Sequence, residues 1–329
     1  MNGDVEAMLF EIANRAQELK ARGAALEAED VLPGDVVDWM VANRFFKLFV
    51  PRALGGAELR LSEGVQIIEA LAGVEGNLGW QAQIGSGGGY FVPSFAREVA
   101  ERVYADPRAV IAGSGAPLGQ AKPVPGGYVV SGRWSYASGA QYATLFTANC
   151  VLPDGRIRAM AFLPEQVRLI RDWNALGMRA TSSWTMEVEE VFVPEELSFV
   201  TGEWKWDPGS PVYRVPFDLF ATACVGAVLI GLARAFFEEV GGDGRDEAEP
   251  FRRLFFTAVA HLETLQAKGA LDEAEHRHIG WMMRHAASRS RELVLRAMPV
   301  LGMRAIKPGE RVSRILRDLL TAGQHYALR

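Results

Sequence analysis

The spacing of apolar residues changes twice along this chain, and no other feature of the sequence limits the fold as strongly. Up to about Asp106 apolar residues recur at helical spacing, from about Arg108 to Val200 they alternate in short runs between turn residues, and from about Phe217 the helical spacing returns. A period of about 3.6 residues is typical of amphipathic helices and a period of two is typical of half-buried strands. The sequence therefore predicts helices, then a sheet, then helices.

This order favours an α+β fold over an alternating βα fold. We expect an N-terminal helical domain over residues 1–106, a central antiparallel β-sandwich or barrel over residues 107–205 and a C-terminal helical bundle over residues 206–329. The apolar run from Phe220 to Phe237 contains Arg234 and is short for a membrane span, so a buried helix is predicted. No GxGxxG motif joins a strand to a helix, so the sequence gives no support to a Rossmann dinucleotide site.

Composition excludes several classes of function. The chain has 329 residues and a net charge of −5, and its basic residues are spread along the sequence, which argues against nucleic-acid or membrane partners and favours a small-molecule substrate. Cys150 and Cys224 are the two cysteines and lack metal-ligand spacing, so we expect free thiols, a reducing compartment and no metal site. Acidic residues near the N-terminus do not fit a signal peptide, and we expect the protein in the cytoplasm.

Three segments resemble one family. The order of helices and strands, the segment GMRATSSWTMEVEEVFVPEE from Gly177 to Glu196 and the terminal RVSRILRDLLTAGQH resemble the acyl-CoA dehydrogenase superfamily of flavoproteins. Within that superfamily, GGYVVSGRWSYASGAQYATLF from Gly126 to Phe146 is more similar to two-component monooxygenases that hydroxylate phenols with reduced flavin. The resemblance implies a FAD or FMN cofactor, taken up in reduced form from a separate flavin reductase, and a homotetramer or homodimer.

The strand around WSYASG is expected to face the flavin. Trp134, Tyr136 and Ser138 would share one face at a period of two, where aromatic and hydroxyl groups can form a platform with fixed hydrogen-bonding groups. The resemblance implies that Ser138 lies at flavin N5 and that Tyr136 holds the place of a ring-contacting tryptophan. It also implies that GSGAPLGQA, read as a turn, passes the pyrimidine edge of the ring, with Ser114 as a candidate contact.

The sequence lacks the catalytic base of the dehydrogenases that it resembles. The two positions at which the superfamily places a catalytic glutamate hold Tyr326 and Ala221. His325 stands beside the first of them, and in the hydroxylase branch the matching histidine deprotonates the substrate or supports the flavin hydroperoxide, work that suits the pKa of about 6.5 of a free histidine. We expect one helix to present Asp318, Thr321 and His325 on a single face.

Further residues carry secondary expectations. We expect Arg317 to contact the cofactor. Arg317 and Asp318 are also expected to pair with neighbouring helices or to lie at a subunit interface. The glycine run from Gly85 to Gly89 predicts either a roomy wall over the flavin or a loop that breaks a helix. Arg252 or Arg253 could replace the pyrophosphate-binding arginine of the longer family helices.

Three functions remain open at this point. The first is a reduced-flavin monooxygenase acting on an aromatic substrate, with His325 and Ser138 as catalytic residues. The second is an FAD-dependent acyl-CoA dehydrogenase whose base has moved. The third is a homologue without catalytic activity.

Overall fold

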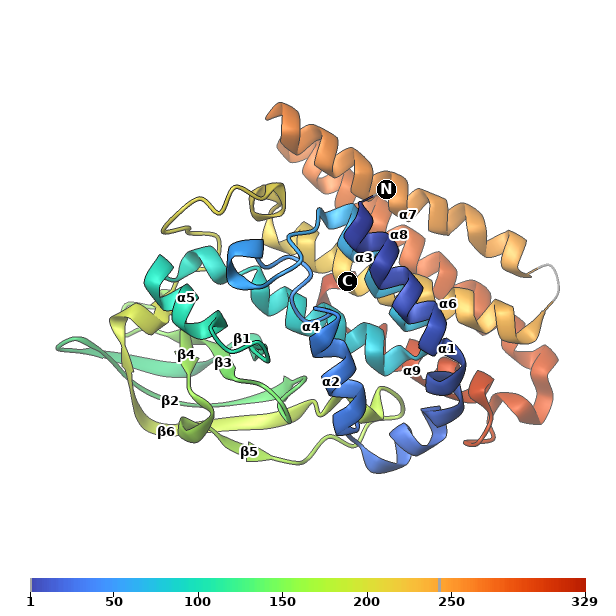
Figure 1. The fold of residues 1–329 in the computed structure, drawn as a ribbon, viewed down its shortest axis with the longest axis horizontal. Coiled ribbons are helices and arrows are strands. Elements are labelled where there is room, and N and C mark those ends of the chain that lie inside the picture. Colours follow the sequence, from blue (N-terminus) through green and yellow to red (C-terminus); the bar gives the residue numbers. More distant parts are fainter. Residues whose placement is uncertain (1, 242–243) are drawn as a thin grey trace.

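A computed structural model describes residues 2–241 and 244–329 and places helices from both ends of the chain beside one sheet (Figure 1). Of the first helices, the one over Leu61–Val74 packs on the C-terminal bundle, and the one over Gly76–Gly89 lies between that bundle and the sheet. The α-helices are α1 (Gly3–Glu29), α2 (Gly34–Ala42), α3 (Leu61–Val74), α4 (Gly76–Gly89), α5 (Arg97–Tyr104), α6 (Phe217–Val240), α7 (Gly244–Lys268), α8 (Glu273–Ala297) and α9 (Arg311–Ala322).

The helices of both ends share one hydrophobic core. Buried side chains of α1, α3, α4, α6, α8 and α9 belong to a single cluster. Helix α6 is long and apolar enough to cross a membrane by composition alone, but 94% of its most apolar window is buried inside the protein. The prediction of a buried helix from Phe220 to Phe237 is therefore confirmed. Because the outer segments share a core, the division at residues 106 and 205 stays a proposal about domains.

The sheet has the order β5-β6-β2-β1-β3-β4-β7. Its strands are β1 (Ile111–Val124), β2 (Gly127–Ala137), β3 (Leu145–Val151), β4 (Ile157–Phe162), β5 (Arg168–Ile170), β6 (Trp184–Pro194) and β7 (Ser198–Phe199). All neighbours are antiparallel except β1 and β3, which run parallel, so the expected antiparallel sheet is corrected to a mixed one. The α+β fold class holds.

A wide bulge interrupts β1 where the sequence predicted a turn. Ser114 pairs with Ala148 of β3, and the next recorded pair is Gly119 with Cys150, so the residues between them leave the ladder. The bulge residues are exposed, and Leu118 keeps 59% of its surface. The segment GSGAPLGQA is thus a strand with a bulge, because Ser114 and Gly119, on the two sides of the bulge, both pair with β3.

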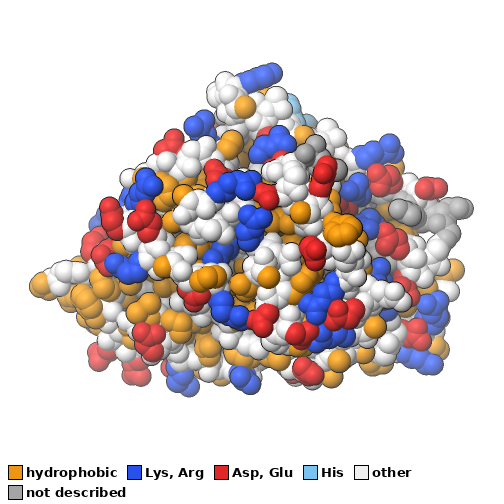
Figure 2. All heavy atoms as spheres, in the orientation of Figure 1, with side chains coloured by type: hydrophobic (Ala, Val, Ile, Leu, Met, Phe, Trp, Pro, Cys, Tyr) orange, Lys and Arg blue, Asp and Glu red, His pale blue; other side chains and the backbone are white. Residues whose placement is uncertain are grey.

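Charged side chains are mixed on the face shown in Figure 2, with basic and acidic groups interspersed. Many of them pair, as Arg15 and Arg22 of α1 do with Asp35 of α2. This face therefore has no extensive patch of one sign.

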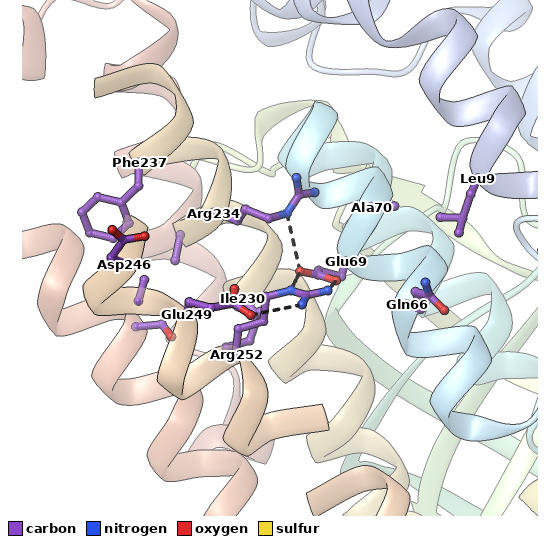
Figure 3. Close-up of a pocket in the computed structure, with 13 residues that line it drawn as sticks. Leu9, Gln66, Glu69, Ala70, Ile230, Arg234, Phe237, Asp246, Glu249 and Arg252 are labelled. Carbon is purple, nitrogen blue, oxygen red and sulfur yellow. Dashed lines mark hydrogen bonds and ion pairs between the residues drawn. The ribbon is translucent and has the colours of Figure 1, made fainter. Parts of the chain in front are cut away.

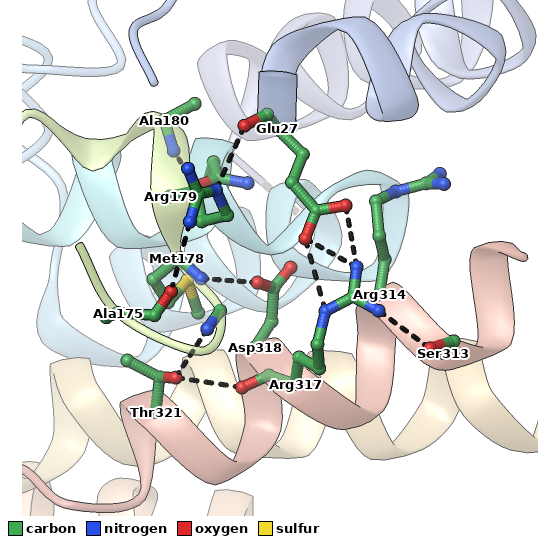
Figure 4. A network of polar contacts seen from close by, with 12 residues as sticks. Glu27, Ala175, Met178, Arg179, Ala180, Ser313, Arg314, Arg317, Asp318 and Thr321 are labelled. Atoms are coloured by element: carbon green, nitrogen blue, oxygen red, sulfur yellow. Dashed lines mark hydrogen bonds and ion pairs between the residues drawn. The ribbon is translucent and has the colours of Figure 1, made fainter. Parts of the chain in front are cut away.

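A tight turn between β5 and β6 docks on α9 and joins the sheet to the C-terminal end of the chain (Figure 4). The N–H of Met178 donates to the carboxylate of Asp318 at 2.5 Å, and the N–H of Gly177 donates to the hydroxyl of Thr321 at 2.9 Å. A side chain at Gly177 would overlap the backbone carbonyl of Arg317. Only glycine permits this approach.

We predict that Gly177→Ala destabilises the protein, because a methyl group has to push the turn away from α9. Forcing a side chain into a closed contact costs about 1–3 kcal/mol. Thermal and urea unfolding measure the loss. Gly34→Ala is the control, since a methyl group there meets nothing within 4 Å. Equal stability of Gly177→Ala and the native protein would contradict the close approach.

Candidate functional site

A cavity of about 170 Å³ lies where α4, the sheet, α6 and the C-terminal end of the chain meet. Its walls are mostly apolar, including Phe91, Phe217 and Phe220. His325 and Ser114, two of the residues singled out in the sequence, also line it. A mostly apolar cavity with a few convergent polar groups is typical of a small-molecule site.

Helix α4 forms one wall despite its glycines. The run Gly85–Gly89 is helical, so the predicted loop that breaks a helix is absent, whereas the roomy wall over the flavin stays a prediction. A side chain at Gly88 would collide with Ile111 of β1, which shows that the absence of side chains lets the helix approach the sheet. Packing against neighbours therefore outweighs the low helix propensity of glycine here.

Ser138 lies at the end of β2 in a chain of hydroxyl groups. Its Oγ receives a hydrogen bond from Trp80 Nε1 at 3.1 Å and lies 2.7 Å from Ser183 Oγ. Ser183 Oγ lies 2.6 Å from Thr181 Oγ1, which donates to the carbonyl of Met178 at 2.7 Å. All three hydroxyl residues are buried.

All four contacts of this chain are hydrogen bonds in a single arrangement of the protons, which follows from its two ends. An indole N–H only donates and a carbonyl only accepts, and each hydroxyl has a single proton. In this arrangement Thr181 donates its hydroxyl proton to the carbonyl of Met178. Ser183 then donates to Thr181, and Ser138 donates to Ser183. In that arrangement Ser138 keeps one acceptor position and has no proton left to donate. Its side chain is 3% exposed and is not among the residues that line the cavity.

His325 lies outside the helix on which it was expected. Helix α9 ends at Ala322, and His325 precedes a short 3₁₀ helix, Tyr326–Leu328, so it does not share a helical face with Asp318 and Thr321. Those two residues hold the Met178 turn, whereas His325 turns to the cavity. Gly323 follows α9 directly, and its N–H donates to the carbonyls of Leu319 and Thr321.

The environment of His325 keeps its ring neutral. Desolvation by burial, and secondarily the charge of Arg329, lowers the pKa of His325 to about 4. Its Nδ1 accepts from the N–H of Ala327 at 3.3 Å, which places the proton of the neutral ring on Nε2. At neutral pH this histidine is thus a donor through Nε2.

Trp80 connects the two predicted catalytic residues. Its ring packs edge-on against the His325 ring with 5.7 Å between centroids, while its indole nitrogen bonds Ser138. The sequence did not lead us to predict Trp80, Thr181 or Ser183 as residues of the site. The segment ATSSW did contain a run of hydroxyl residues next to a predicted strand, which was the signal available for two of them.

The expected common face of Trp134, Tyr136 and Ser138 is absent. Trp134 is fully buried in the sheet core, and its Nε1 donates to the carbonyl of Asn149. Tyr136 has φ of +70° and keeps 70% of its surface, with its ring edge against Trp173. The left-handed residue breaks the alternation of the strand, so Trp134 points away from the side that Tyr136 exposes.

The arginines named in the sequence have protein partners. Arg317 forms a bidentate ion pair with Glu27 of α1, which agrees with pairing to a neighbouring helix (Figure 4). Arg252 binds the buried carboxylate of Glu69 through two nitrogens, at 2.5 and 2.9 Å. Arg253 is exposed. Arg317 and Arg252 therefore each already neutralise an acidic side chain.

Glu69 and Arg252 belong to a larger hollow of about 570 Å³ (Figure 3). Arg234 of α6 also points to Glu69, with 3.5 Å between their nearest charged atoms. Glu69, Arg234, Glu249 and Arg252 of this hollow form ion pairs, and it contains neither His325 nor Ser114, so it is a poorer candidate than the smaller cavity.

Curated relatives of the chain are flavin-dependent monooxygenases. The chain is 30% identical over 275 residues to the indole-3-acetate monooxygenase of Pseudomonas putida, covering 82% of this chain and 69% of that protein. It is 31% identical over 242 residues to the flavin-dependent monooxygenase oxygenase subunit HsaA of Mycobacterium tuberculosis, covering 70% and 61%. No family model matches the chain.

Solved structures share the fold. The crystal structure of HsaA superposes with a TM-score of 0.88 at 24% identity, covering 97% of this chain and 92% of that one. XiaF from Streptomyces, solved with FADH2 and glycerol, superposes with a TM-score of 0.87 at 19% identity, covering 99% and 92%. The chain therefore belongs to the flavin-dependent monooxygenases, the oxygenase components of two-component systems, which are oxidoreductases with an acyl-CoA dehydrogenase-like fold and use FAD or FMN.

Proposed function

We propose that this protein hydroxylates a small aromatic molecule with reduced flavin at the cavity between α4, β1 and α6. The observation that carries the proposal is the convergence of His325 and Ser138 on Trp80, one as a neutral N–H donor and the other as a hydroxyl with a free acceptor position. Reduced flavin would supply two electrons to O₂, so that one oxygen atom enters a C–H bond of the aromatic ring and the other leaves as water.

Ser138 is matched to the reduced form of a flavin. Reduced flavins carry a hydrogen on N5, whereas oxidised flavins have a lone pair there. Because Ser138 donates its proton to Ser183, it can accept a hydrogen bond from N5–H and cannot donate one to oxidised N5. The hydroxyl chain thus favours the cofactor state that an oxygenase component receives. Ser114 and the exposed Tyr136 remain proposed contacts of the flavin.

His325 would serve the oxygen chemistry as a donor. A ring with a pKa of about 4 is a poor base at neutral pH, so substrate deprotonation by His325 is disfavoured, and hydrogen bonding from Nε2 to an oxygen atom in the cavity is favoured. The mostly apolar walls lower the local dielectric constant around that oxygen, which strengthens the bond.

Dehydrogenation of a thioester lacks a base in this cavity. Among the described residues that line it, no carboxylate is present, and Ala221 and Tyr326 occupy the two expected positions. A non-catalytic role has no observation in its favour. We also propose a flavin reductase as partner, a homotetramer or homodimer and a cytoplasmic location.

The test of the function is anaerobic titration with reduced FMN and FAD, followed by ¹⁸O₂ and a panel of phenols. We expect reduced flavin to bind and one ¹⁸O atom to enter the product. His325→Ala should keep flavin binding and lower hydroxylation by about 10²-fold, the loss typical of removing one hydrogen-bond donor to an oxygen that gains negative charge. Thioester oxidation without oxygen incorporation, or no binding of reduced flavin, would refute the proposal.

We predict that Ser183→Ala weakens the preference for reduced flavin, because Ser138 then has a proton free to donate. The ratio of the dissociation constants of oxidised and reduced flavin should fall about fivefold, the worth of one hydrogen bond of about 1 kcal/mol. Ser182→Ala is the control, since the Ser182 hydroxyl bonds Gln141 and lies outside the chain. An unchanged ratio in Ser183→Ala would show that the proton direction does not matter.

The pKa of His325 makes stability depend on pH. An unfolded histidine titrates near about 6.5, so between that value and the folded pKa of about 4 the unfolded chain binds the extra proton. Stability should therefore fall as pH decreases through this window, and less so in His325→Gln. NMR of the imidazole signals measures the pKa directly, and a midpoint of His325 near that of the exposed histidines would contradict the burial.

A further inference from the structure

Gln83 stands in the cavity wall without a hydrogen-bond partner. The side chain comes from α4, is 5% exposed and lines the cavity. Its amide nitrogen is buried and bonds no atom of the described residues. By contrast, Gln81 on the same helix donates to the carbonyl of Thr181. A buried donor without a partner costs free energy unless a ligand supplies an acceptor.

The charge of the cavity limits what that ligand can be. None of the described lining residues is Lys, Arg, Asp or Glu, and His325 is neutral at pH 7. A carboxylate entering this cavity would lose its water without gaining a countercharge, which is strongly unfavourable. An uncharged oxygen, as in a phenol, needs only a hydrogen bond, which the Gln83 amide can give when it turns its buried nitrogen to the cavity.

The size of the cavity suits one aromatic ring. Its volume is about 170 Å³, close to an engineered cavity of about 150 Å³ that holds benzene. Gly87 follows Gln83 by four residues and so shares its helix face, and a side chain at Gly87 would meet nothing within 4 Å. Helix α4 thus offers a polar group and, one turn later, open space.

We propose that Gln83 is the recognition group for an uncharged, single-ring aromatic substrate with an oxygen substituent, and that the cavity rejects aromatic carboxylates. This inference rests on the proposed function and narrows its substrate class. It also sets the chain apart from the relative named for indole-3-acetate, whose substrate carries a carboxylate.

Calorimetry on the anaerobic complex with reduced flavin tests the proposal without turnover, using three probes of similar shape. 4-Ethylphenol and 4-hydroxyphenylacetate differ in the carboxylate, and 4-ethylphenol and 4-ethyltoluene differ in the hydroxyl. We expect 4-ethylphenol to bind at least about tenfold more tightly than the carboxylate, as one uncompensated charge requires. Gln83→Leu should weaken 4-ethylphenol binding about fivefold and leave 4-ethyltoluene unchanged.

Two control variants separate recognition from structure. Gly87→Ala removes space and should weaken both neutral probes alike, whereas Gln120→Leu, on an exposed part of β1, should change neither. Binding of the carboxylate as tightly as 4-ethylphenol, or equal weakening of both neutral probes by Gln83→Leu, would overturn the proposal. Flavin binding is measured in the same samples, so failure of the cofactor to bind is distinguished from a wrong substrate class.

Discussion

The docking of the Gly177–Met178 turn on α9 is the contact on which the site depends. It brings together two parts of the chain that are about 140 residues apart, with Asp318 and Thr321 each accepting an N–H of the turn. The same turn continues into Thr181 and Ser183, and α9 continues into His325. One contact thus fixes both the hydroxyl chain that ends at Ser138 and the position of the histidine, so a shift of the turn would disturb both.

Buried charges support this contact. Asp318 and Glu75 are each 5% exposed, and burial is the main reason that the pKa of both carboxyl groups lies above its usual value, with their mutual proximity adding to that of Asp318. Arg314, whose charge lies 3.9 Å from Glu75, opposes the shift. Removing one member of such a group leaves a buried charge without a partner. The free-energy cost of that change is larger than the net stabilisation that the intact group gives. The cluster therefore fixes the geometry of the turn more than it adds stability.

The sequence predicted the parts that depend on local pattern. Period indicated the helical ends and the central sheet, the length of the apolar run and its Arg234 indicated the buried helix α6, and the terminal motif led to His325. The end of α9 at Ala322, before His325, was missed. The parallel pairing of β1 with β3 and the left-handed Tyr136 depend on contacts made after the chain has folded, which no local pattern records. Trp80 lies 58 residues from Ser138, so its role also required the structure.

The central proposal for the site is that Ser138 offers a hydrogen-bond acceptor to the flavin while it donates its own proton to Ser183. A crystal structure of the complex with reduced FMN, prepared without oxygen, tests it most directly. We predict that flavin N5 lies within hydrogen-bonding distance of Ser138 Oγ and that the contacts from Trp80 to Met178 stay intact. A flavin ring bound away from Ser138, or a complex in which Ser138 has left Ser183, would contradict it.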